Sequence, residues 1–227
     1  MVHYYYISFL LNYFPMIKLM ICDDHQIIRD GLSQILGLYG DIEIVRAIST
    51  GEALFKVLRT EKPDVLLLDI SLPGRSGLEV LKQVKLLYPE ISVLILSMYP
   101  EDQFAIRMLK AGASSYLNKD TPPDTLVEAI RTIAGGGEYI SKEVANLLVG
   151  EVIKENEMLP HQVLSDREYE VLLLIGQGKS ITDISHKLSL SVKTISTYRS
   201  RLMSKLSIQS NAELVKYMIR HGIIGTD

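Results

Sequence analysis

Acidic side chains stand at the ends of two short apolar runs in the first half of the chain. Asp69 ends the run Val65 to Leu68 and is followed closely by a Pro-Gly pair. Asp23 and Asp24 end an earlier run in the same way. A short apolar run bounded by turn residues is typical of a strand buried on both faces of a sheet. In open α/β sheets, ligands bind at the carboxyl ends of such strands.

Two later apolar runs end on side chains with different chemistry. Ser97 ends one of them, and Lys119 follows the other. Three carboxylates at one edge repel each other unless a divalent cation lies among them, and hard carboxylates favour Mg²⁺. An ammonium can hold a phosphoryl oxygen, and a hydroxyl can hydrogen-bond another. This set suits the formation of an aspartyl-phosphate on Asp69.

The elements that must position these residues alternate between strand and helix. Strands are expected over 17–22, 42–47, 64–69, 92–96 and 115–117, and helices over 24–38, 50–59, 77–87, 102–111 and 122–134. This alternation predicts a parallel sheet with helices on both faces, in one α/β domain from residue 16 to about 137. In the first helix, the apolar spacing predicts a buried side made of Ile27, Ile28, Leu32, Ile35 and Leu36.

Length and charge indicate two domains with different partners. The chain has 227 residues and a net charge of −3. Residues 164–227 contain nine Lys/Arg and six Asp/Glu, so they carry +3 and the remainder carries −6.

The one cysteine, Cys22, stands in an apolar run, which predicts a buried thiol. A disulfide within the chain is thereby excluded, and a cytoplasmic location fits.

The first fifteen residues do not fit the strand–helix pattern. Tyr4 to Phe14 is aromatic and uncharged, but it is too short to span a bilayer. It also lacks the basic start and the cleavage site of a signal peptide. We expect residues 1–15 to be an extension that is not part of the fold, with no membrane partner; a weak membrane-surface anchor is the alternative.

The second domain is expected to be all helical. Residues 138–163 are predicted to be a linker with one short helix over 141–149 and a flexible charged stretch over 151–160. Ser165 and Glu168 have the spacing of a capping box at the start of the next helix. Further helices are expected over 180–187, 192–206 and 211–221. A helix, a tight turn and a second helix place the second helix in the major groove of DNA.

The helix over 192–206 has one apolar and one polar side. The apolar side contains Val192, Ile195, Leu202, Met203 and Leu206, and the polar side contains Lys193, Thr197, Ser200, Arg201 and Ser204. No acidic residue occurs between Asp183 and Glu213. Binding to DNA needs cations beside the phosphates and short polar side chains that can approach the base edges. This helix offers both, which favours a DNA contact. Arg199 lies near the apolar side and is expected to pair with an acid of the first helix, such as Glu168.

The first domain resembles the receiver domain of two-component response regulators. The resemblance is carried by Asp23-Asp24, by Asp69 with Leu72-Pro73-Gly74, and by Ser97, Tyr116 and Lys119. It implies a flavodoxin-like sheet with strand order 2-1-3-4-5 and phosphorylation of Asp69 by a sensor histidine kinase. It further implies that Mg²⁺ binds to Asp24, Asp69 and the backbone carbonyl of Ser71, with Asp23 acting through water. Lys119 would hold the phosphoryl group, and Ser97 and Tyr116 would form the switch pair.

The second domain resembles the LuxR-type helix-turn-helix, so the chain as a whole resembles the NarL/FixJ class. The resemblance implies double-stranded DNA as a partner and a homodimer in the phosphorylated state. Base-edge contacts would come from Ser196, Thr197 and Ser200, and phosphate contacts from Lys193, Thr194, Arg201 and Lys205. The last helix would supply a dimer contact through Leu214, Val215, Met218 and Ile219. The expected division is 1–15 extension, 16–137 receiver, 138–163 linker and 164–227 DNA-binding domain.

The leading expectation is a phosphorylation-switched transcription factor that is not an enzyme, and three other functions compete with it. A phosphohydrolase using Asp69 as nucleophile would need a general acid/base and a substrate cap, and no insertion could form the cap. A flavin or nucleotide binder would need a phosphate loop where Asp23-Asp24-His25 stands. A ligand-switched regulator would not need the complete acidic set. Release of the 191–206 helix from masking is one way in which phosphorylation could act; whether the two domains are in contact without phosphorylation is left open by the sequence.

Overall fold

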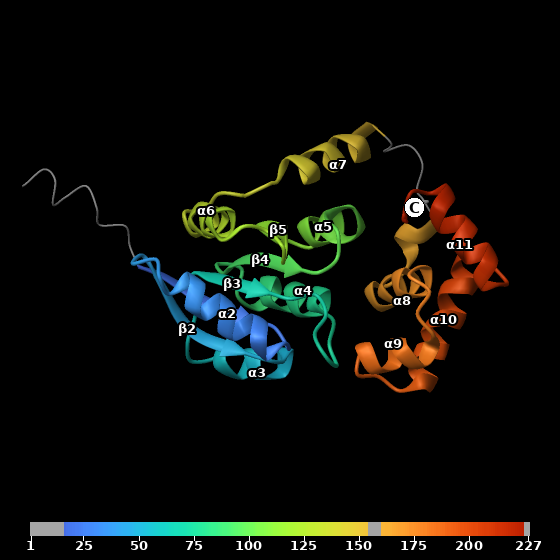
Figure 1. Cartoon of the computed structure of the whole chain (residues 1–227), viewed down its shortest axis with the longest axis horizontal. Helices are drawn as coiled ribbons and strands as arrows, with labels where there is room; N and C mark the ends of the chain where they lie inside the picture. The colour runs from blue at the N-terminus through green and yellow to red at the C-terminus, as the bar shows by residue number, and fades with distance from the viewer. Residues whose placement is uncertain (1–15, 154–159, 225–227) are drawn as a thin grey trace, which may run out of the picture.

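The computed structural model describes residues 16–153 and 160–224. The expected extension, residues 1–15, lies outside the described residues. Five parallel strands form one sheet in the order β2-β1-β3-β4-β5 (Figure 1). Their bounds are β1 (Ile17–Cys22), β2 (Ile42–Ile48), β3 (Val65–Leu68), β4 (Ser92–Ser97) and β5 (Ser115–Asn118). The expected fold and strand order are confirmed.

Helices cover both faces of the sheet. They are α2 (Gln26–Leu36), α3 (Gly51–Val57), α4 (Gly77–Leu87), α5 (Glu101–Lys110) and α6 (Pro123–Ala134). Alternate strand residues point to opposite faces, so Leu19 and Ile21 pack with α2 and α6 in one core. Met20 and Cys22 pack on the other face, in the core that α3, α4 and α5 share. The thiol of Cys22 is buried as expected, and burial raises its pKa to about 12.

The buried side of α2 is narrower than its apolar spacing predicted. Leu36 is fully buried, but Ile27 is 86% exposed and Ile35 is also exposed. The prediction that these two isoleucines face the core was wrong. Helix α2 packs mainly against the edge strand β2 and helix α6, so one narrow stripe of the helix is covered.

The linker contains a longer helix than expected. Helix α7 (Lys142–Ile153) extends beyond residue 149, so residues 151–153 are helical and the prediction of a flexible stretch was wrong for them. Its start is fixed on the receiver side, because Ser141 Oγ donates to Glu101 Oε2 at 2.6 Å and Val144 is buried. Residues 154–159 are outside the described part of the chain.

A helical unit follows and packs beside α4 and α5, at the end of the sheet where the strands finish (Figure 1). It consists of the 3₁₀ turn η1 (Pro160–Val163), α8 (Asp166–Gly176), α9 (Ile181–Lys187), α10 (Val192–Leu206) and α11 (Asn211–Arg220). The expected capping box is confirmed. Ser165 N donates to Glu168 Oε2 at 2.7 Å, and Glu168 N donates to Ser165 Oγ at 3.4 Å. Ser180 and Asp183 form a second box at the start of α9.

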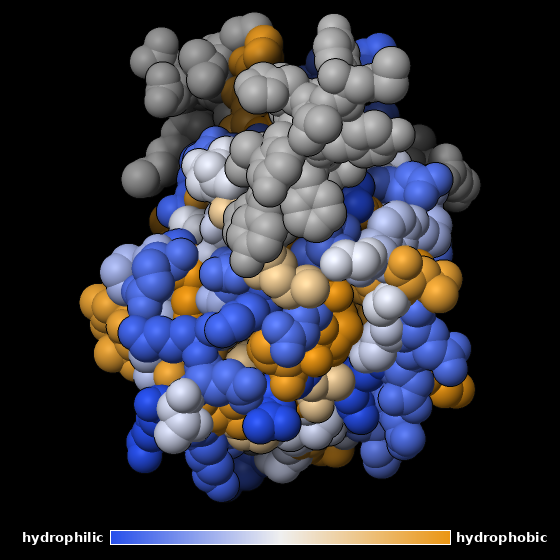
Figure 2. Space-filling model, turned by 90° about the vertical axis from the view of Figure 1, so that its left-hand side faces the viewer, coloured by the Kyte–Doolittle hydropathy of each residue, from blue (hydrophilic) through white to orange (hydrophobic). Residues whose placement is uncertain are grey.

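Within residues 16–153 and 160–224, no helix combines the length and apolar character needed to cross a membrane. Figure 2 shows the end of the molecule where the strands begin, with apolar side chains in separate patches among charged ones.

Gly77, the first residue of α4, is required by the close approach of this helix to β3. A Cβ at Gly77 would lie 2.4 Å from the carbonyl oxygen of Asp69 and 2.5 Å from Ile70 Cα. Both are backbone atoms and cannot move aside alone. We therefore expect Gly77→Ala to lower the free energy of unfolding of the α/β unit by about 3 kcal/mol, measured by denaturant titration with circular dichroism.

Gly31, inside α2, is the matched control. A Cβ there would meet no atom within 4 Å. The same substitution should therefore stabilise the helix by about 0.5–1 kcal/mol, because alanine loses less backbone entropy. Equal losses in the two variants would contradict this account of Gly77.

Candidate functional site

The acidic site lies where β1 and β3 end side by side. Cys22 pairs with Leu68 in the sheet, and the amide of Asp69 donates to the carbonyl of Cys22 at 2.9 Å. The two carboxylates that follow these strands, Asp23 and Asp69, are each only 3% exposed. One potential ligand atom from each of Asp23, Asp24, His25 and Asp69 lies within 4.8 Å of the others. The sequence-predicted acidic set is therefore one cluster.

Lys119 neutralises part of this negative charge. It follows β5, and its amide donates to the carbonyl of Ser97 at 2.8 Å. Its Nζ lies 2.6 Å from Asp23 Oδ2 and 2.8 Å from Asp69 Oδ2. Burial lowers the pKa of Lys119, but the attraction of Asp69 and the bonds to both carboxylates outweigh it, so the pKa is raised. Lys119 is therefore a cation that bridges the two buried acids.

The surroundings of Asp69 change the pKa of its carboxyl group. Burial raises its pKa; the charge of Lys119 opposes this, and the charge of Asp23 adds to it. The net shift is upward. An additional cation beside Asp69 would reverse the effect of burial by favouring the charged form. Oxygen ligands from two or three carboxylates, partly shielded from water, fit a hard divalent cation.

Ser97 and Tyr116 lie behind this cluster. Ser97 is fully buried, and its Oγ accepts from the amide of Tyr99 at 3.0 Å. The hydroxyl of Tyr116 donates to the carbonyl of Tyr99 at 2.9 Å, and its ring is already buried. The amide of Ser71 donates to Asp69 Oδ1 at 3.3 Å. Both members of the predicted switch pair thus contact the segment around Tyr99.

Two residues of the site were not assigned a role from the sequence. The Nδ1 of His25 lies 2.7 Å from Asp24 Oδ1, an ion pair when the imidazole is protonated. Arg29, one helical turn further along α2, donates to the carbonyl of Asp23 at 2.6 Å. Only the positions of His25 and Arg29 could have indicated a role in the site. Both residues follow the Asp23-Asp24 pair within one and a half helical turns.

The second predicted site is a polar surface on α10. Ser191 caps the helix by accepting from the amide of Thr194 at 3.0 Å. The turn before it contains Ser189 with φ of 53°, which lets the chain reverse between α9 and α10. Thr194 is half-buried, and the other predicted base-edge and phosphate residues are exposed: Lys193, Ser196, Thr197, Ser200, Arg201 and Lys205. The polar face is open even with the two units in contact, so this contact does not mask the helix.

Three side chains of the helical unit differ from expectation. Val192 is 48% exposed, so it is not part of the buried side. Arg199 donates from Nη2 to Asn211 Oδ1 at 2.8 Å, so the expected pair with Glu168 was wrong. Lys205 holds Glu168 instead, at 2.6 Å, and this ion pair competes with its predicted phosphate contact.

Two of the four apolar residues on α11 that were predicted to contact a second copy are buried inside the helical unit itself. Leu214 and Met218 are fully buried in the core of the helical unit. Val215 is half-buried and Ile219 is 40% exposed. Only this second pair remains available to a partner.

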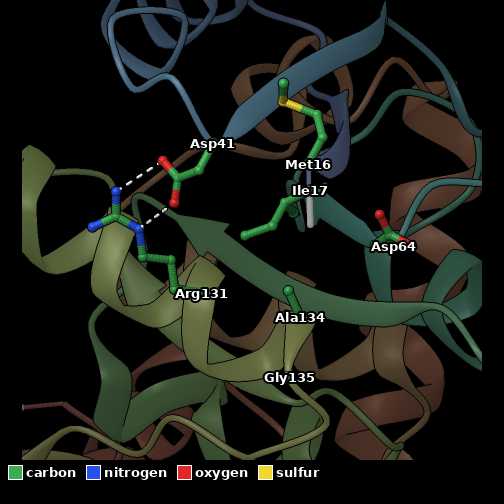
Figure 3. A pocket seen from close by; sticks show the side chains of 7 residues that line it. All are labelled: Met16, Ile17, Asp41, Asp64, Arg131, Ala134 and Gly135. Atoms are coloured by element: carbon green, nitrogen blue, oxygen red, sulfur yellow. Dashed lines mark hydrogen bonds and ion pairs between the residues drawn. The ribbon is translucent and has the colours of Figure 1, made fainter. Parts of the chain in front are cut away.

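A pocket of about 310 Å³ lies at the opposite edge of the sheet (Figure 3). Arg131 and Asp41 form a two-bond ion pair on one side of it, at 2.7 and 2.9 Å. Met16, Ile17, Asp64, Ala134 and Gly135 complete the lining. The basic group of this pocket, Arg131, is already bound by Asp41. The pocket lies at the edge of the sheet where the strands begin. The acidic cluster is therefore the better candidate for the functional site.

Comparisons with known proteins identify the two domains that contain these residues. Residues 19–131 match the family described as "Response regulator receiver domain", and residues 162–218 match "Bacterial regulatory proteins, luxR family". The oxygen regulatory protein NreC of Staphylococcus epidermidis is 35% identical over 91% of this chain and 99% of its own length. The response regulator GacA of Pseudomonas aeruginosa is 36% identical, over 92% and 98%.

Solved structures of similar proteins extend the comparison to the fold. The RcsB response regulator of Salmonella typhimurium has a TM-score of 0.65 at 26% identity, over 91% of this chain and 98% of its own. RcsB bound to the promoter rprA with the phosphomimetic BeF₃⁻ has a TM-score of 0.61 at 26% identity, over 88% and 97%. With a receiver domain and a LuxR-type helix-turn-helix in the same order as these relatives, the chain belongs to the NarL/FixJ class of two-component response regulators.

Proposed function

We propose that the protein is a DNA-binding transcriptional regulator that is activated by phosphorylation of Asp69. The observation that carries the proposal is the buried cluster of Asp23, Asp69 and Lys119 in the same chain as an exposed polar helix-turn-helix face. The phosphoryl donor would be a sensor histidine kinase. This partner and a DNA operator are both in the bacterial cytoplasm, which is therefore the proposed location.

The proposed roles in the receiver follow from the chemistry of each group. An oxygen of Asp69 attacks the phosphorus of the donor, the bond from phosphorus to the leaving group breaks, and the leaving group departs with the bonding pair. Lys119 holds a phosphoryl oxygen, which neutralises charge as the bond forms. Asp24, Asp69 and the Ser71 carbonyl would hold Mg²⁺, with Asp23 acting through water. The ion would supply positive charge for the phosphoryl oxygens.

Ser97 and Tyr116 are proposed as the residues that transmit the change. Ser97 would hydrogen-bond the phosphoryl group, which removes its Oγ from the amide of Tyr99. Because Tyr116 binds the carbonyl of the same residue, the segment around Tyr99 is the part of the backbone that would respond. The proposed division remains 1–15 extension, 16–137 receiver, 138–163 linker and 164–227 DNA-binding domain.

For DNA, α10 is proposed as the recognition helix. Ser196, Thr197 and Ser200 would meet base edges, and Lys193, Thr194 and Arg201 would meet phosphates. Lys205 would have to leave Glu168 to do so, which makes it the weakest of the proposed contacts. A phosphohydrolase is the less favoured function, since both sequence families matched by the chain are regulatory.

The central test is phosphorylation of Asp69 by acetyl phosphate in the presence of Mg²⁺. Asp69→Asn should abolish labelling, because an amide is not a nucleophile of comparable strength. Lys119→Ala should slow it by about 10²-fold, since one charge-stabilising group is lost. Asp64→Asn is the matched control at the opposite edge of the sheet and should be labelled like the wild type. Labelling of Asp69→Asn at wild-type level, measured by mass spectrometry, would show the site to be wrong.

The DNA contacts can be separated by salt dependence. Lys193→Ala should weaken binding to every sequence and reduce the slope of log affinity against log salt by about one. Thr197→Ala should leave the slope unchanged and cost about 1–3 kcal/mol at one base position only. Lys216→Ala, an exposed cation on α11, is the control and should change neither. If Thr197→Ala behaved like Lys193→Ala, α10 would not be reading bases.

Phosphorylation should act mainly through the dimer. One helix-turn-helix reads few base pairs, and of the four residues in the apolar stripe of α11 only Val215 and Ile219 remain accessible to a partner. We expect phosphorylation to raise affinity for two properly spaced half-sites by about 10²-fold and to leave a single half-site nearly unchanged. Fluorescence anisotropy with both DNAs, using Asp69→Asn as the unphosphorylated control, measures this. Equal gains on the two DNAs would argue against a dimer switch.

A further inference from the structure

His25 stands at the N-cap of α2, directly after the Asp23-Asp24 pair, but its side chain does not cap the helix. The N-cap position favours short side chains whose oxygen accepts from an amide of the first helical turn. His25 has the extended backbone of an N-cap residue, with φ of −83° and ψ of 108°, and makes no side-chain cap hydrogen bond. Its amide donates to Asp23 Oδ1 at 2.8 Å. Helix formation therefore does not explain an imidazole at this position.

The imidazole of His25 is turned toward the acidic cluster. Its Nδ1 lies 2.7 Å from Asp24 Oδ1 and 3.3 Å from Asp23 Oδ1. The side chain is 61% exposed, so little packing constrains the ring to this orientation. The ring therefore forms the solvent-facing side of the cluster, opposite the buried ammonium of Lys119.

One oxygen of Asp24 lacks the partner that its burial calls for. Among the described residues, Asp24 Oδ1 is shielded from solvent and accepts no hydrogen bond. A polar atom removed from water without a partner costs free energy. The ring nitrogen of His25 is close to this oxygen but is not in hydrogen-bonding geometry with it. Two ligand atoms at such a separation suit one shared ion, because adjacent ligands in an octahedral shell of radius about 2.1 Å are about 3 Å apart.

The other ligand atoms of the cluster complete this arrangement. Lys119 Nζ binds Oδ2 of both Asp23 and Asp69, so their Oδ1 atoms are the ones left for an ion. Asp69 Oδ1 accepts one long hydrogen bond, from the Ser71 amide at 3.3 Å. One potential ligand atom from each of the three acids and from His25 lies within 4.8 Å of the others. Carboxylate oxygens and one imidazole nitrogen thus converge on the same small volume.

We propose that His25 Nδ1 is a ligand of the divalent cation in the acidic cluster, and that it raises the affinity of the site for first-row transition-metal ions relative to Mg²⁺. A site made of oxygen ligands alone suits Mg²⁺, whereas an imidazole nitrogen adds affinity for ions such as Fe²⁺, Co²⁺ and Zn²⁺. The inference rests on the proposed function of Asp69, and it deepens that function by naming the class of cation that the site selects.

A neutral ligand also suits the charge and the coordination number of this site. Three carboxylates already lie in the cluster, and an imidazole nitrogen completes the shell of the ion without adding a fourth negative charge. Six-coordinate binding through Asp24, Asp69, the Ser71 carbonyl and His25 uses four positions. Two positions remain for water or for an oxygen of the phosphoryl group, so the nitrogen ligand is compatible with phosphorylation of Asp69.

The first test measures cation affinity in the full-length protein without a polyhistidine tag. Isothermal titration calorimetry with MgCl₂ and with CoCl₂ is made at about pH 8, where histidine side chains are ordinarily neutral. His25→Ala should lower the affinity for Co²⁺ by at least about 10-fold, since even the loss of an outer-shell partner costs this much. The affinity for Mg²⁺ should change by less than about 3-fold, because Mg²⁺ readily keeps a water in place of the nitrogen. His186→Ala, at an exposed position of α9, is the control and should change neither affinity.

A conservative substitution separates a ligand from a residue that only positions Asp24. His25→Asn keeps a hydrogen-bond donor of similar reach, and asparagine is a favoured N-cap residue, so α2 is retained. A positioning role would leave both affinities at the wild-type level in this variant. A ligand role predicts that Co²⁺ affinity falls as in His25→Ala while Mg²⁺ affinity is kept, because the amide offers oxygen in place of the imidazole nitrogen.

A spectroscopic measurement detects the nitrogen directly. With Mn²⁺ bound, pulsed electron paramagnetic resonance of the wild type and of His186→Ala should show coupling to a nitrogen nucleus, and His25→Ala should lose it. Equal losses of Mg²⁺ and Co²⁺ affinity in His25→Ala, unchanged affinities in His25→Asn, or a wild-type spectrum without nitrogen coupling would each overturn the proposal. If the wild type bound no divalent cation, or if binding survived Asp24→Asn unchanged, the proposed metal site of the receiver would itself be refuted, and this ligand with it.

Discussion

The attraction of one buried ammonium for two buried carboxylates holds the functional edge of the receiver together. Lys119 lies within 2.8 Å of both Asp23 and Asp69, and all three are almost completely enclosed. Two carboxylates removed from water without this cation would be driven to protonate. One ammonium still leaves the pair with excess negative charge. The edge can therefore accept more positive charge, and a buried ion pair of this kind adds little net stability by itself.

The order of the strands brings these groups together. Because β1 lies beside β3, the residues that follow them, Asp23 and Asp69, are neighbours in space although 46 positions apart in the chain. The next strands in the sheet, β4 and β5, run in the same direction, so Ser97 and Lys119 lie at the same edge as the two acids. Residues that carry the chemistry thus come from four strand ends, while helices on both faces keep the sheet rigid. A sheet paired in another order would separate the two acids.

The sequence predicted those parts of the structure that depend on local pattern. Buried runs ending in polar residues identified the strands and the site, and the Ser165–Glu168 spacing identified a helix start, since both signals lie within a few residues. Contacts between side chains that are far apart in the sequence were not predictable in this way. Glu168 could bind either Arg199 or Lys205, and only the packing of α10 on α8 selects Lys205. Likewise, the periodicity of α2 does not reveal that its neighbours cover one narrow stripe, which leaves Ile27 in solvent.

The helix α8 shows why an interface between domains is the hardest feature to infer. Arg167 and Glu170 have the charged character of the solvent-exposed side of an amphipathic helix, and within the DNA-binding domain alone that side would face water. The receiver covers it, so both residues are buried, and Arg167 binds one carboxylate oxygen of Glu170 and the carbonyl of Gly74. An interface made from such groups is specific but gains little net energy, because the same groups are well solvated when it opens.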